Sequence, residues 1–167
     1  MEMKEALRLN ARFGEACKND PAFSEMADGF LELIRKTDFM MAESGVVEAC
    51  TRCAVKTGSC CFREMGESYS PVQLFLNLLL GAAMPSKTSF PGGCRFVGEK
   101  GCTLPARHAF CLNYFCPDLK KSLGDGQIDL MQRVIGEQLM VGWDLELMLA
   151  EWIADADEKT EIGPAAR

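Results

Sequence analysis

The chain has few of the residues and motifs that define common classes of enzyme. Its single histidine, His108, leaves little material for a Ser-His-Asp triad or a histidine-rich zinc centre. It contains neither a G-x-G-x-x-G sequence nor a Gly-Lys-Ser/Thr phosphate-binding motif. It also has no internal repeat and no low-complexity segment. The sequence therefore favours neither a nucleotide-binding enzyme nor a triad hydrolase.

Positive charge is also scarce. The 167 residues include 18 Lys and Arg against 24 Asp and Glu, which gives a formal net charge of -6. Adjacent basic residues occur only at 35–36 and 120–121. Because nucleic acids and anionic membranes attract concentrated Lys and Arg, we expect neither of them as a partner.

Long apolar runs are missing as well. The longest, near residues 74–83, is interrupted by Asn77 and Gly81, so no membrane span is expected. The first twenty residues alternate acidic and basic side chains and lack the apolar core of a signal peptide. We therefore expect a cytoplasmic protein, in which thiols stay reduced.

Cysteine, by contrast, is abundant. Eight of the nine cysteines lie between residues 50 and 116. They are Cys50, Cys53, Cys60, Cys61, Cys94, Cys102, Cys111 and Cys116. In a reducing compartment such a cluster is more typical of a metal site than of disulfides, and the odd total also disfavours full pairing. Cys17 stands alone and is expected to be an inert, buried residue.

The residues around this cluster predict helices. Apolar residues recur at helical spacing over 2–18, 21–43, 71–80 and from 128 to about 157. Asp20-Pro21 and Ser70-Pro71-Val72-Gln73 have the form of helix starts. We expect a bend or break near Gly136 or Gly142, and Trp143 and Trp152 as packing anchors.

The expected fold is mainly α, with helices flanking an irregular, cysteine-rich, metal-binding middle segment. Within that segment, a short helical turn near Cys50 and a loop at Gly58 are expected. Residues 95–97 suggest one strand of a short β-hairpin that turns at 98–101. We predict a single domain over residues 1–167. It comprises an N-terminal helical pair (1–45), a cysteine-cluster segment (46–118) and C-terminal helices (126–158).

Thiolates are preferred ligands of zinc, cuprous ion and iron–sulfur clusters, and a closed site usually takes four. Cys50 and Cys53, separated by two residues, can bind one ion from a tight turn. Adjacent side chains diverge, so one member of the Cys60-Cys61 doublet is expected to bind a second ion, bridge two ions or remain a spare. The eight cysteines can fill two four-thiolate sites, one cluster with spares, or a binuclear site. His108 is either a further ligand or, more often for a lone histidine, a loop residue or a hydrogen-bond partner of a ligand.

The cysteine pattern resembles that of the YkgJ-type cysteine-cluster family. The resemblance rests on the pair Cys50 and Cys53, the doublet Cys60-Cys61, Gly93-Cys94-Arg95-Phe96, Gly101-Cys102, and Arg107 four residues before Cys111. His108 stands where the family has proline, and Leu104-Pro105 replaces the usual Ile-Tyr. The resemblance covers about residues 50–116 and implies a domain that chelates zinc or iron.

The sequence therefore predicts a metal-binding protein that holds zinc or iron, as single ions or as an iron–sulfur cluster, through all eight clustered cysteines. A catalytic role is not favoured. The alternative is a redox enzyme or redox sensor in which Cys50-Thr51-Arg52-Cys53 is the reactive pair. A third hypothesis is a zinc-organised module that binds an unidentified protein.

Overall fold

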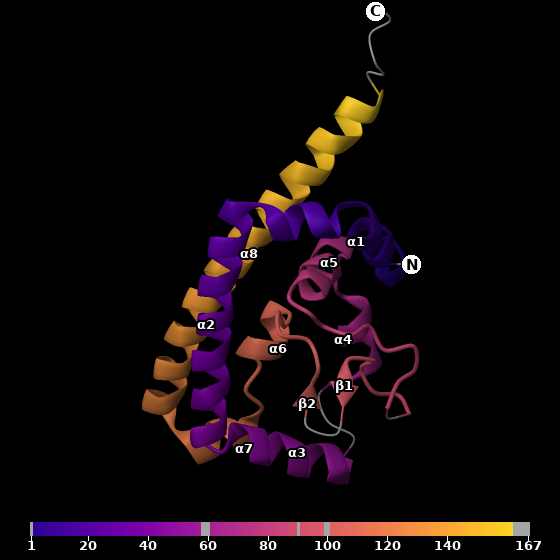
Figure 1. The fold of residues 1–167 in the computed structure, drawn as a ribbon. Helices are drawn as coiled ribbons and strands as arrows, with labels where there is room; N and C mark the ends of the chain where they lie inside the picture. Colours follow the sequence, from indigo (N-terminus) through magenta and orange to yellow (C-terminus); the bar gives the residue numbers. More distant parts are fainter. Residues whose placement is uncertain (1, 58–60, 90, 99–100, 162–167) are drawn as a thin grey trace, which may run out of the picture.

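A computed structural model describes residues 2–57, 61–89, 91–98 and 101–161 (Figure 1). The elements in these ranges are α1 (Glu2–Asn19), α2 (Pro21–Glu43), α3 (Val46–Thr57), α4 (Arg63–Glu67), α5 (Pro71–Leu79), β1 (Val97–Gly98), β2 (Gly101–Cys102), α6 (Ala109–Asn113), α7 (Pro117–Leu123) and α8 (Asp125–Glu161). β1 and β2 pair antiparallel, with Val97 opposite Cys102. The protein is mainly helical with one short hairpin, as the sequence predicts. No helix among the described residues is long and apolar enough to cross a membrane.

The helix starts predicted from the sequence are confirmed. The Asp20 side chain accepts a hydrogen bond from the backbone N–H of Phe23 at 2.9 Å, and Pro21 opens α2. Ser70 and Gln73 form a reciprocal capping box at the start of α5, with both hydrogen bonds at 3.1 Å. These side chains pair N–H groups that a helix start otherwise leaves unsatisfied.

α2 and α8 pack side by side and form the long edge of the molecule, and the end of α8 extends beyond the other helices (Figure 1). The break into two helices considered near Gly136 or Gly142 is not found, because α8 runs unbroken from Asp125 to Glu161. Gly142 instead allows close approach of the two helices. A Cβ atom at this position would lie 3.1 Å from two ring carbons of Phe30 on α2.

Two of the glycines of α8, Gly136 and Gly142, predict opposite effects of alanine. No atom lies within 4 Å of a Cβ built on Gly136, so Gly136→Ala is expected to stabilise the protein by about 0.5–1 kcal/mol through helix propensity. Gly142→Ala is expected to destabilise it by about 1 kcal/mol or more, because the buried Phe30 ring must move. Urea unfolding of both variants measures the difference; equal stabilisation would contradict the close packing.

A first apolar cluster joins α1, α2, α5 and the second half of α8 to the cysteine segment. Leu74, Phe75 and Leu76 on α5 are almost fully buried in it. Cys94, Phe96 and Leu104 belong to the same cluster, so the loops around the hairpin are packed against the helical body. Apolar burial thus holds the irregular middle segment in place.

A second apolar cluster lies where α2, α3, α6, α7 and the start of α8 meet. Its buried residues are Met41, Val46, Leu112, Phe115, Leu119, Ile128, Met131 and Ile135. Two expectations for these helices were wrong. α3 is a helix of 12 residues rather than a short turn, and Trp143 on α8 is 66% exposed rather than a packing anchor. Trp152 does pack against the first cluster, as predicted.

Cys17 on α1 is buried, as expected for a lone cysteine, with 2% of its surface exposed. Burial raises the pKa of its thiol to about 11, and the charge of Asp20 adds to the shift. In the unfolded chain this thiol ionises near its ordinary pKa of about 8.5. The folded protein therefore gains stability from the neutral thiol below that pH and loses it as the pH rises toward about 11.

Cys17→Ala is accordingly expected to flatten the alkaline loss of stability. Between about pH 8 and pH 11 the wild type should lose about 2 kcal/mol more than this variant. Urea unfolding across the pH range measures both proteins. Parallel pH curves for the two would show that Cys17 titrates as an ordinary, solvated thiol.

Candidate functional site

Two segments that are distant in sequence meet through backbone pairing and bring two cysteines together. The N–H of Cys94 donates to the carbonyl of Cys61 at 2.8 Å. Next to this bond, Phe62 and Gly93 form an isolated antiparallel bridge. Cys102 follows on β2, and the N–H of the next residue, Thr103, donates to the Phe96 carbonyl at 2.8 Å.

The thiols of Cys61, Cys94, Cys102 and Cys111 act electrostatically on one another. The pKa of Cys111 is raised to about 12, chiefly by burial and also by negative charge on the other three thiols. Burial is also the main cause of the raised pKa values of Cys94 and Cys102, although Cys102 as a whole residue keeps solvent-exposed surface. Four thiols from different segments therefore interact, and negative charge on Cys61, Cys94 and Cys102 disfavours the ionisation of Cys111.

Tyr69 lies near three of these thiols, those of Cys94, Cys102 and Cys111, and is 2% exposed. Its hydroxyl accepts a hydrogen bond from the N–H of His108 at 2.9 Å and donates one to the Cys111 sulfur. The ring contacts Phe96 and His108 edge to face, with centroids 5.3 and 5.6 Å apart. Burial, and then charge on Cys102, raises the pKa of Tyr69. Tyr69 is thus a neutral hydrogen-bond donor among thiols.

Tyr69→Phe tests this role. The variant keeps the ring but leaves the N–H of His108 unpaired and removes the donor to Cys111. We expect stability to fall by about 1–3 kcal/mol and the pKa of Cys111 to rise, because the hydrogen bond that favours its thiolate is lost. Denaturant unfolding and pH-dependent alkylation of Cys111 measure the two effects. Tyr114→Phe, at an exposed position, is the matched control and should change neither.

The loop that leads to Cys111 is held by a buried amide. Asn77 on α5 is fully buried, and its Nδ2 donates to the Ala106 carbonyl at 2.9 Å. Its Oδ1 accepts from the Ala106 N–H at 3.0 Å, and Nδ2 also donates to the Gln73 carbonyl. A single side chain thereby pairs both backbone groups of Ala106 and fixes the approach to α6.

Two further residues position the thiols. Arg107 binds the carboxylate of Asp38 on α2, and its positive charge lowers the pKa of Cys102, against the larger effect of burial. Gly66 on α4 allows Cys94 to approach closely, because a Cβ atom there would lie 3.2 Å from the Cys94 sulfur. The four cysteine thiols are therefore bounded by α2 on one side and by α4 on another.

His108 is the N-cap residue of α6. Its ring Nδ1 accepts a hydrogen bond from the backbone N–H of Phe110 at 3.2 Å. Its backbone N–H donates to the Tyr69 hydroxyl. Of the two roles weighed for this histidine, the geometry favours hydrogen bonding beside the cysteines. The cap orients Cys111, whose N–H donates to the His108 carbonyl at 2.9 Å.

Of the other predicted ligands, Cys50 and Cys53 lie on α3 and Cys116 at the start of α7. Cys50 and Cys53 are exposed on α3, three residues apart and thus on one helix face. Cys116 is partly buried at the start of α7 and packs against the second cluster, as does Ala49 on α3. Cys60 lies outside the described residues. The electrostatic interactions thus group Cys61 with Cys94, Cys102 and Cys111.

In the described ranges, no three His, Cys, Asp or Glu side chains are already close enough together to hold a metal ion. The four thiols thus share a region and supply suitable soft donors, without yet forming a ligand shell. Searches against protein-family models, curated proteins and solved structures find no match for this chain.

Sequence reasoning missed Tyr69, Gly66 and the role of Asn77. Asn77 did leave a signal, since it is a polar residue inside the most apolar run of the chain. A buried amide in such a run is expected to pair with backbone groups of another segment. Nothing in the local sequence marks Tyr69, because its partners are 25–42 residues further along the chain.

Proposed function

We propose that this protein chelates zinc or iron through the thiolates of Cys61, Cys94, Cys102 and Cys111. The observation that carries the proposal is the electrostatic interaction of Cys111 with the other three thiols, beside a buried Tyr69 on which Cys94, Cys102 and Cys111 also act. Repulsion among the thiolates disfavours the ionised group without a cation, and a bound divalent ion would reverse that balance. The donor set is soft and matches the preference of zinc and of iron–sulfur clusters.

The residues of this chain supply what such a centre needs besides ligands. Tyr69 donates a hydrogen bond to the Cys111 sulfur, which stabilises its thiolate. Arg107 places a positive charge near Cys102. Metal binding must draw the sulfurs closer together than they now lie.

We further propose Cys50, Cys53 and Cys116, with Cys60, as a second set of ligands. α3 and the start of α7 share the second apolar cluster, which brings Ala49 and Cys116 to the same part of the fold. With two sets, each member of the Cys60-Cys61 doublet serves a different site, as expected from the divergence of adjacent side chains. The resemblance of the cysteine pattern to the YkgJ-type family, and a cytoplasmic location, are part of the same proposal.

A redox role is the second candidate function, because Cys50 and Cys53 are exposed on one helix face. Exposed thiols are the ones that oxidants reach first. In that case α3 would carry a reactive pair, and the buried thiols around Tyr69 would be structural.

Metal analysis and an absorption spectrum of protein purified without oxygen separate these functions. One or two zinc ions per colourless chain support a structural chelation module. Brown protein with iron and acid-labile sulfide supports a cluster that transfers or senses electrons. Metal-free protein that neither zinc nor ferrous ion can load, with Cys50 and Cys53 readily oxidised, would overturn chelation in favour of the redox role.

A further inference from the structure

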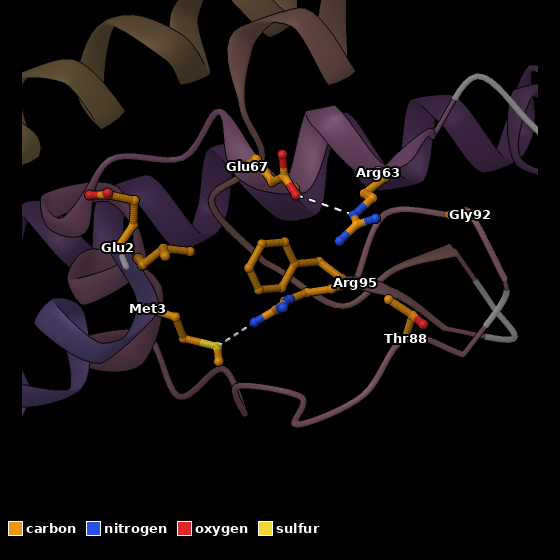
Figure 2. A pocket seen from close by; sticks show the side chains of 11 residues that line it. Glu2, Met3, Arg63, Glu67, Thr88, Gly92 and Arg95 are labelled. Carbon is orange, nitrogen blue, oxygen red and sulfur yellow. Dashed lines mark hydrogen bonds and ion pairs between the residues drawn. The ribbon is translucent and has the colours of Figure 1, made fainter.

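A cavity of about 590 Å³ opens beside the four cysteine thiols (Figure 2). It is lined by the first turn of α1, by α4, and by residues 88, 92–93 and 95. Its apolar wall includes Phe96 and Leu74, which are 1% and 2% exposed and belong to the first apolar cluster. Because both residues are fixed by core packing, this wall is rigid. The volume lies within the range of small-molecule binding sites.

Two arginines line the same cavity. Arg63 pairs with Glu67 one helical turn further on, at 3.3 Å, and both side chains remain largely exposed. Arg95 reaches across the cavity to Met3, where a guanidinium nitrogen lies 3.5 Å from the thioether sulfur (Figure 2). A thioether is a weak acceptor, whereas a guanidinium carries five N–H donors arranged to match an oxyanion. In the described parts of the chain Arg95 has no carboxylate partner.

The other residues that line the cavity restrict the charge that a ligand can carry. Thr88 supplies a hydroxyl, and Gly92 and Gly93 bring exposed backbone to the wall. Glu2 and Glu67 also line the cavity, so its arginines are balanced by two carboxylates. A polyanion such as a nucleic acid would be repelled by these carboxylates, whereas a ligand with a single charged group could bind Arg95 and avoid them.

We propose that this cavity binds a small organic oxyanion, a carboxylate or a phosphate monoester, with an apolar body. Arg95 binds the charged group, Arg63 supports it, and the apolar part lies against Phe96 and Leu74. Gly66 lines the cavity and stands next to the Cys94 sulfur. Only Gly66 would therefore separate the bound molecule from the Cys94 thiol. The proposal does not depend on metal binding.

The test is an amide NMR titration of the full chain with three probes of similar apolar body: benzoate, phenyl phosphate and benzylammonium. We expect saturable shifts at Gly66, Thr88 and Gly93 with the two anions and none with the cation. The anion that binds more tightly identifies the charged group of the natural ligand. Arg95→Gln is expected to weaken anion binding about tenfold or more, because a charge-assisted hydrogen bond is lost. Arg35→Gln, at an exposed Arg paired with Glu32 on α2, is the matched control and should bind as the wild type does.

Three results would overturn the proposal: no saturable shift with either anion, equal binding of benzylammonium, or unchanged anion binding by Arg95→Gln. Arg95 is exposed, so its replacement is expected to leave the fold intact, which thermal unfolding verifies. Should that variant fail to fold, Arg63→Gln takes its place. A smaller but measurable loss of anion binding supports the proposal, and unchanged binding counts against it.

Discussion

Cys94→Ser is expected to lower the affinity for zinc by a factor on the order of 100 or more. Cys94 is 6% exposed, is packed against Gly66, and is held by the hydrogen bond from its N–H to the Cys61 carbonyl. Serine fits the same space, but its hydroxyl stays protonated at neutral pH and is a hard donor that zinc binds poorly in place of a thiolate. The fold should therefore persist while the centre loses one of its four ligands.

Competition with a chromophoric chelator measures the affinity, and circular dichroism monitors the fold. Cys17→Ala is the matched control, since it removes a buried cysteine outside the group and should bind zinc as the wild type does. Wild-type affinity in Cys94→Ser would exclude Cys94 from the centre. Equal loss in both variants would trace the effect to general destabilisation rather than to a missing ligand.

Asn77→Ala is expected to lower the free energy of unfolding by about 3 kcal/mol or more. The substitution removes the partners of the N–H and C=O of Ala106, and each unpaired buried backbone group costs about 1–3 kcal/mol. It also leaves a small cavity between α5 and the loop at Ala106. Because the Ala106 loop leads to His108 and Cys111, zinc affinity should fall together with stability.

Urea unfolding of Asn77→Ala beside Asn113→Ala separates a buried amide from an exposed one. Asn113 lies on the surface at the end of α6, so its replacement should change stability by less than about 0.5 kcal/mol. Similar small losses in both variants would show that the two hydrogen bonds to Ala106 contribute little.

The helical part of the fold was predictable because its signals are local. Apolar periodicity and the caps at Asp20 and Ser70 depend on residues three or four positions apart, and they gave the bounds of α1, α2 and α5 closely. The unbroken α8 was not predictable, because a glycine such as Gly142 is compatible both with a helix break and with close packing of two helices. Only the position of Phe30, far away in sequence, distinguishes a helix break from a close helix contact.

The composition of the candidate site was predictable, but its grouping was not. The density of cysteine already indicated soft-metal chemistry. Which thiols share a region depends on the pairing of the Cys61 and Cys94 segments and on the burial of Tyr69, and both are set by tertiary packing. The Cys50–Cys53 pair, which spacing alone makes the most familiar ligand motif, is exposed on α3.

Metal-dependent protection of individual cysteines from alkylation tests the proposed centre most directly. Protein loaded with zinc or ferrous ion without oxygen is treated with iodoacetamide beside chelator-treated protein, and each cysteine is quantified by mass spectrometry. We predict that the metal slows alkylation of Cys61, Cys94, Cys102 and Cys111 together, while Cys17 reacts equally slowly in both states. Identical alkylation of these four cysteines with and without metal would contradict the proposed centre.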